Sequence, residues 1–127
     1  MLKFWMAEDD RNKVISALSQ IEARSAICRL RKERRMTSDE ATVVLDAISA
    51  EMRRLIEQPV NPQVIEAANA LVDRHTLRAL DAVQLGSAVI ARELLGRQEM
   101  RLVSSDQNLL EAAQVEGFAT WNPIAGD

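Results

Sequence analysis

Three acidic residues follow apolar segments at positions where carboxylates can act on a phosphate. Glu22 lies one turn into a predicted helix behind an apolar strand, Asp81 opens the most apolar helical segment, and Asp106 follows a second strand. Because ligands of open parallel α/β sheets bind beyond the carboxyl ends of the strands, we expect these carboxylates to converge on one sheet edge. Oxygen-only sites of this kind suit Mg²⁺ or Mn²⁺, which would orient a water and offset the charge on a phosphate.

Each of the three residues also has a purely structural interpretation. Glu22 can be a solvated helix glutamate, and Asp81 has capping-box spacing to Gln84. Asp106 can cap the helix that follows it, together with Ser105. Taken singly these interpretations are the stronger ones, and only the predicted convergence of the three residues favours a site. Arg78, one helical turn before Asp81, fits either a role near the acids or a structural salt bridge.

The elements that would position these acids are predicted from the apolar periodicity. Residues 13–18 are typical of a buried strand, and four helices are expected at 19–35, 37–55, 62–74 and 80–95. Thr37 and Glu40 have capping-box spacing, Pro62 suits a first helical turn, and Gly96 ends the last of the four helices. Strands at 100–104 and 118–121 flank one more short helix. This order predicts a parallel sheet with helices on its faces.

Composition limits the classes of function. The 127 residues suffice for one domain, 1–127, and the net charge of −3 does not indicate a nucleic-acid binder. Residues 29–35 nevertheless carry five basic side chains, which could face phosphates or form a solvated helix end that the helix dipole favours. Cys28 is the only cysteine and fits a reducing compartment, and His75, the only histidine, gives little support for nucleophilic catalysis. With neither a signal peptide nor an apolar run of membrane-spanning length, we expect a cytoplasmic protein that does not contact membranes.

Three segments resemble a known family. They are VISALSQIEARSAICRL at 14–30, HTLRALDAVQLGSA at 75–88, and LVSSDQNLLEAA with GFATWNP from 102 to 123. In this order they are similar to PIN-domain ribonucleases of the VapC toxin kind. The resemblance implies a helix-rich, three-layer α/β/α fold with a short parallel sheet. It also implies RNA hydrolysis with Mg²⁺ or Mn²⁺ at catalytic Glu22, Asp81 and Asp106, a cognate antitoxin, and a homodimer.

The family's first strand and its Asp have no counterpart in this sequence. Met1–Trp5 cannot pair in parallel with residues 13–18, because a parallel crossover needs a dozen or more residues. We therefore interpret residues 1–10 as the tail of the family's first helix and expect an N-terminally truncated domain with an unpaired strand edge. A start assigned too far downstream, a shortened chain and a degenerate toxin would each explain this.

Three functions stay open from the sequence. The first is a metal-dependent ribonuclease toxin. The second is a remnant that binds RNA or an antitoxin without cleaving. The third is a purely helical interaction protein, which scattering of the three acids in space would favour.

Overall fold

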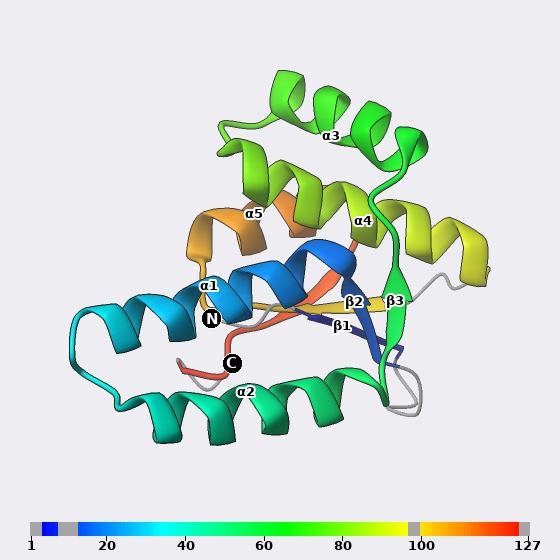
Figure 1. Ribbon diagram of the computed structural model, residues 1–127. Helices are drawn as coiled ribbons and strands as arrows, with labels where there is room; N and C mark the ends of the chain where they lie inside the picture. The colour runs from blue at the N-terminus through cyan, green and yellow to red at the C-terminus, as the bar shows by residue number, and fades with distance from the viewer. Residues whose placement is uncertain (1–3, 8–12, 97–99, 125–127) are drawn as a thin grey trace.

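The computed structural model is an α/β structure with five helices and five strands in the described part of the chain, residues 4–7, 13–96 and 100–124 (Figure 1). Residues 4–7 are described by their backbone alone. The elements are β1 (Phe4–Ala7), β2 (Lys13–Ser16), α1 (Ala17–Lys32), α2 (Ser38–Met52), β3 (Ile56–Gln58), α3 (Pro62–Arg74), α4 (Ala79–Leu95), β4 (Met100–Val103), α5 (Gln107–Val115) and β5 (Ala119–Trp121). All five predicted helices and the strands β2, β4 and β5 are confirmed, with ends shifted by a few residues.

The five strands form one mixed sheet in the order β3-β2-β1-β4-β5. β2 pairs in parallel with β3, and β4 pairs in parallel with β5. β1 lies between the two pairs and runs antiparallel to both of its neighbours. The predicted parallel sheet is therefore wrong at its centre, yet β2, β3, β4 and β5 all point the same way. Their carboxyl ends consequently lie at one edge of the sheet.

β1 corrects the interpretation of residues 1–10 as a helix tail. Phe4–Ala7 is a strand, and Trp5 pairs with Val14 on one side and Leu102 on the other. The short connection to β2 forbids a parallel pair, but an antiparallel hairpin needs only a few residues between its strands. The strand also pairs the inner edges of β2 and β4, so the unpaired edge that we expected there is absent. Residues 1–3 and 8–10 of the predicted helix tail lie outside the described residues.

Helices cover both faces of the sheet. Val14, Met100 and Leu102 pack in one apolar cluster with residues of α4 and α5. Ile15, whose side chain points to the opposite face of β2, packs with Ala23 of α1 and Met52 of α2. Figure 1 shows α3 and α4 on one side of the sheet and α2 on the other. The helix-covered layers predicted from the sequence are thus present.

Two details of the prediction were wrong. The three-residue strand β3 (Ile56–Gln58) was missed, because two of its residues are polar and it follows a helix almost without a break. The apolar pattern of residues 62–74 predicts Val64, Ile65, Ala68 and Leu71 as an inner face, but Ile65 is 44% exposed, whereas the other three are buried. The buried side of α3 is therefore narrower than its apolar pattern indicated.

α4 is the most buried helix, with nine buried residues. α3 lies against it at Gly86, where an added Cβ would stand 3.0 Å from the carbonyl oxygen of Val64 and 3.1 Å from the nitrogen of Ala68. α3 is fixed at its start by Asn61, whose Oδ1 accepts a hydrogen bond from the Val64 N–H at 2.9 Å. A glycine at position 86 thus sets the distance between the two helix backbones.

We predict that Gly86→Ala lowers the free energy of unfolding by about 1–3 kcal/mol, because the new methyl group would overlap backbone atoms of α3. In an open helix the same change would stabilise by about 1 kcal/mol through helix propensity. Urea unfolding followed by circular dichroism measures the difference. A rise in stability would contradict the close approach of α3 and α4.

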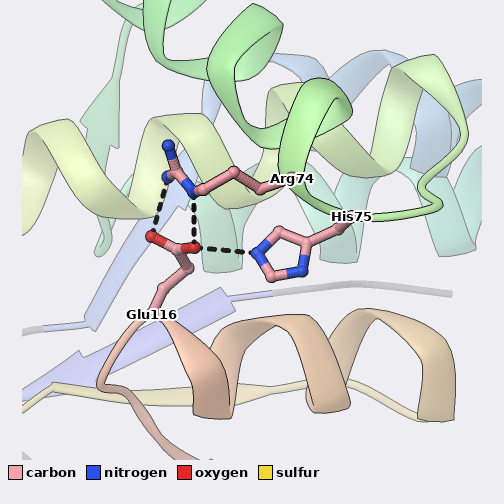
Figure 2. A network of polar contacts seen from close by, with 3 residues as sticks. All are labelled: Arg74, His75 and Glu116. Atoms are coloured by element: carbon pink, nitrogen blue, oxygen red, sulfur yellow. Dashed lines mark hydrogen bonds and ion pairs between the residues drawn. The ribbon is translucent and has the colours of Figure 1, made fainter.

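A polar clamp joins the end of α3 to the end of α5 (Figure 2). Arg74 donates to Glu116 through Nη2 at 2.9 Å and Nε at 3.2 Å, and His75 Nε2 lies 2.8 Å from the same carboxylate. Burial alone would raise the pKa of Glu116, but the hydrogen bonds from Arg74 and His75 lower it below its ordinary value of 4.5. The clamp therefore holds Glu116 in its charged form.

We predict that Glu116→Gln lowers the free energy of unfolding at neutral pH by about 1–2 kcal/mol, the usual size of a charge-assisted hydrogen bond to a partly exposed partner. Because the folded-state pKa is lowered, this stabilisation is present above pH 4.5 and is lost as the pH falls through the folded-state pKa. Urea unfolding from pH 7 down to pH 3 should show the two proteins converging. The control Glu111→Gln, exposed on α5, should match the parent protein at every pH; a gap between Glu116→Gln and the parent that does not narrow in acid would exclude the clamp.

Candidate functional site

Every buried polar side chain in the described part of the chain lies at or near the carboxyl edge of the sheet. Two of these residues end strands, one follows β4, one lies in the first turn of α1, and three lie on the first half of α4. They are Ser16, Ser19, Gln58, Asp81, Gln84, Ser87 and Ser104. Since buried polar groups cost free energy unless they are partnered, their concentration at one edge makes this edge the candidate site.

Ser16 and Ser87 fix α4 to the end of β2. The Ser87 hydroxyl donates to the carbonyl oxygen of Val83 at 2.8 Å, so its oxygen is left to accept. The Ser16 hydroxyl donates to that oxygen at 3.2 Å and itself accepts the Leu18 N–H, which caps α1. Both serines are fully buried. The start of α1 and the middle of α4 are thereby held at one position on the sheet edge.

Gln84 connects α4 to the first acidic candidate. Its Nε2 donates to the Ser19 hydroxyl at 3.1 Å and to a carboxylate oxygen of Glu22 at 2.5 Å. Gln84 is fully buried, whereas Glu22 is partly exposed. Glu22 is thus a held side chain at the sheet edge and not the solvated helix glutamate of the structural interpretation.

Asp81 lies one helical turn before Gln84 and is 7% exposed. The expected role of Asp81 as an N-cap is wrong, because Arg78 occupies the N-cap position and α4 has no side-chain cap. The predicted capping box with Gln84 is likewise absent, since the Gln84 amide is directed to Ser19 and Glu22. In the first turn of α4 the Asp81 carboxylate adds favourably to the helix dipole.

Asp106 is the N-cap of α5, so its structural interpretation is confirmed. Its Oδ1 accepts the Leu109 N–H at 3.2 Å. Its own N–H donates to the hydroxyl of Ser104, at 3.0 Å, and this contact places Ser104 beside the cap in addition to the expected Ser105. Asp106 therefore has a fixed position directly after the end of β4.

The three acids share the sheet edge but do not form one cluster. Glu22 is hydrogen-bonded to Gln84 of α4, and Asp81 lies one turn before Gln84 on the same helix, whereas Asp106 directly follows β4. Across residues 4–7, 13–96 and 100–124 no group of three or more His, Cys, Asp or Glu residues is arranged to hold a metal ion. Oxygen donors of this kind suit Mg²⁺ or Mn²⁺ chemically, and the three acids belong to elements that begin where β2 and β4 end or that contact the end of β2.

In the described part of the chain, the other residues discussed from the sequence take part in none of these hydrogen bonds at the edge. Arg78 is exposed and forms no ion pair with any described residue. His75 caps the end of α3 and belongs to the Glu116 clamp, and Cys28 lies beside Arg31, with Sγ 3.8 Å from Nη2. The basic stretch 29–35 covers the end of α1 and the turn to α2, at the opposite end of α1 from Glu22.

The buried serines are residues that the sequence-based predictions missed. Their signal was present as polar residues at inward positions of apolar segments: Ser16 ends the run VIS, Ser87 interrupts the helix AVQLGSA, and Ser104 ends LVS. Such positions tolerate a hydroxyl only where a partner lies opposite, and that partner becomes visible only in the folded chain.

None of the described helices is long and apolar enough to cross a membrane. The chain matches no family model, and a search of curated proteins finds no matching relative.

We predict that Gln84→Leu lowers the free energy of unfolding by about 1–3 kcal/mol, because the variant removes both amide donors at a buried position while nearly preserving side-chain volume. Urea unfolding measures the loss, and Gln63→Leu, exposed on α3, serves as the control and should change stability little. Equal stability of Gln84→Leu and the parent would mean that the contacts to Ser19 and Glu22 contribute nothing.

Proposed function

We propose that this chain is a ribonuclease of the VapC toxin kind with a PIN-like fold, cleaving RNA phosphodiesters at the carboxyl edge of its sheet. The observation that carries the proposal is the gathering of the buried polar side chains at this edge beside three carboxylates from three different elements. Open α/β sheets bind ligands at such an edge. The resemblance of residues 14–30, 75–88 and 102–123 to VapC-type PIN domains supports the same assignment.

Glu22, Asp81 and Asp106 are the residues that would hold a Mg²⁺ or Mn²⁺ ion. When bound, the ion would offset negative charge on the phosphate and lower the pKa of a water. The chain's own groups supply the rest. Gln84 orients Glu22 through its amide at 2.5 Å, and the cap contact to Leu109 orients Asp106. A carboxylate at this edge would accept the proton of the attacking water.

The proposed partners follow from the same resemblance. A toxin of this kind would be paired with a cognate antitoxin and would form a homodimer. RNA would be held through the basic residues between Arg29 and Arg35, whose guanidinium groups are suited to phosphates. In a dimer the second copy would also offer its own acidic edge to the same RNA.

A second candidate is a PIN-like domain that binds RNA or an antitoxin without cleaving it. Two observations favour it. The strand between β2 and β4 runs antiparallel, so its carboxyl end lies at the other edge of the sheet. The described residues also contain no group of three metal-binding side chains. By contrast, a purely helical interaction protein is excluded by the five-stranded sheet.

We predict that the chain cleaves a labelled single-stranded RNA with Mg²⁺ or Mn²⁺ and not with chelator, and that Asp81→Asn abolishes this cleavage. Asp106→Asn should abolish it as well while preserving the fold, because Asn caps helices as well as Asp does. Asp73→Asn, exposed on α3, is the matched control and should cleave like the parent.

Circular dichroism of every variant separates loss of activity from loss of folding. A folded parent protein that binds the RNA but does not cleave it under any metal condition would overturn the ribonuclease and support the non-cleaving domain. Cleavage that persists in Asp81→Asn would show that the acidic edge is not the site of cleavage.

A further inference from the structure

A second polar site lies at the turn between α1 and α2. A cavity of about 390 Å³ opens there, and its wall is made by the last turn of α1, the turn itself and the first turn of α2. The lining residues are Arg31, Arg34, Arg35, Met36, Thr37, Ser38 and Glu40. This basic pocket is separated from Glu22 by most of the length of α1.

The charge of the pocket is poorly compensated. No carboxylate of the described residues forms an ion pair with Arg31 or Arg34. Arg35 approaches Glu33 at 3.9 Å, but both side chains are exposed, so the pair is weak. Three arginines therefore line one open depression, in which an anion would be favourable.

Glu40 is the one carboxylate in the wall, and it is held by the capping box of α2. Its Oε1 accepts the Thr37 N–H at 2.9 Å, and Thr37 Oγ1 accepts the Glu40 N–H at 3.1 Å. The hydrogen bond from the Thr37 backbone lowers the pKa of Glu40, so its charge remains at neutral pH and is directed to the backbone. One carboxylate, held by the capping box, thus stands against three arginines in the wall.

Arg34 has a backbone conformation that glycine usually adopts. Its φ is +59°, and it is the one non-glycine residue with positive φ in the described part of the chain. The turn closes with a hydrogen bond from the Arg35 N–H to the Leu30 carbonyl oxygen at 2.9 Å. Helices commonly end with glycine at this left-handed position, because a side chain there is strained. Strained residues of this kind are found at binding sites, where the side chain is needed in that place.

We infer that this basic pocket binds a phosphate group of the RNA backbone, as an anchor remote from the acidic edge. The inference rests on the proposed RNA substrate. Arginine forks bind phosphate with two parallel hydrogen bonds, and such contacts position the chain without reading its sequence. From Glu22 to Arg31 the helix rises about 14 Å, so one RNA strand must be several nucleotides long to reach both places. The pocket therefore selects for substrate length.

Arg34→Gly tests the inference, because it removes the charge and relieves the backbone strain at once. RNA binding is measured by fluorescence anisotropy with a labelled twelve-nucleotide single strand, in chelator, across a salt series. We expect an affinity at least roughly threefold lower and a salt slope shallower by about 0.7, the contribution of one phosphate contact in single-stranded nucleic acid. The urea midpoint should rise. Arg53→Gln, an exposed arginine at the end of α2, removes the same charge elsewhere and should change neither quantity.

A labelled dinucleotide too short to span α1 provides the second measurement. Because a dinucleotide can occupy only one of the two places at a time, it should bind the parent more weakly than the twelve-nucleotide RNA, and this difference should shrink in Arg34→Gly. Three results would each contradict phosphate binding at the basic pocket. They are an unchanged affinity for the twelve-nucleotide RNA in Arg34→Gly, an equal loss of affinity in Arg53→Gln, and no RNA binding by the parent protein.

These outcomes are separable from those of the proposed ribonuclease. Metal-dependent cleavage with unchanged RNA binding in Arg34→Gly would contradict phosphate binding at the basic pocket and support the ribonuclease. Weakened RNA binding in Arg34→Gly, without cleavage by any of the proteins, would support phosphate binding at the basic pocket and contradict the ribonuclease. A preference of the pocket for an acidic peptide over RNA would assign it to a protein partner and overturn the phosphate anchor.

Discussion

The buried helix α4 is the element on which the rest of the structure depends. It lies so close to α3 that a Cβ at position 86 would stand 3.0 Å from the Val64 carbonyl oxygen, and its Ser87 is hydrogen-bonded to the end of β2. Its Gln84 reaches α1 through Ser19 and Glu22. A helix buried from several directions cannot shift without breaking packing on each side, so α4 fixes where the surrounding elements meet. The acidic edge is one of those meeting places.

The direction of the central strand β1 determines which strand ends lie at the acidic edge of the sheet. β1 closes the gap between two parallel pairs and so satisfies the backbone groups of β2 and β4. Because it runs antiparallel, it brings its amino-terminal end to the edge at which its neighbours end. Glu22 follows β2 on one side of β1, and Asp106 follows β4 on the other. The same strand that completes the fold therefore lies between the two strands that lead to these acids.

Charge is divided along α1. Glu22, near its first turn, is held by an amide donor at the sheet edge, whereas Arg31 near its last turn faces the basic pocket at the turn to α2. The two ends complement each other in the proposed function, since RNA would be anchored at the basic end while its phosphodiester lies at the acidic end. The Arg74–Glu116–His75 clamp has a different role, because it connects the ends of α3 and α5 and involves none of the site residues.

The positions of most helices and strands could be predicted from the sequence alone, because they depend on interactions between residues that are close along the chain. Thr37 and Glu40 specify the start of α2, Pro62 that of α3, and Gly96 the end of α4, each through hydrogen bonding or backbone geometry within a few residues. The placement of the three acids after strands or at helix starts was also readable from apolar patterning. Tertiary structure decided what depends on distant partners. The hairpin of β1 needed the edges of both β2 and β4, and the roles of Ser16, Gln84 and Ser87 needed the contact of α1 and β2 with α4. Whether Asp81 caps a helix or lies buried at a sheet edge is likewise a matter of packing, which spacing along the chain does not encode.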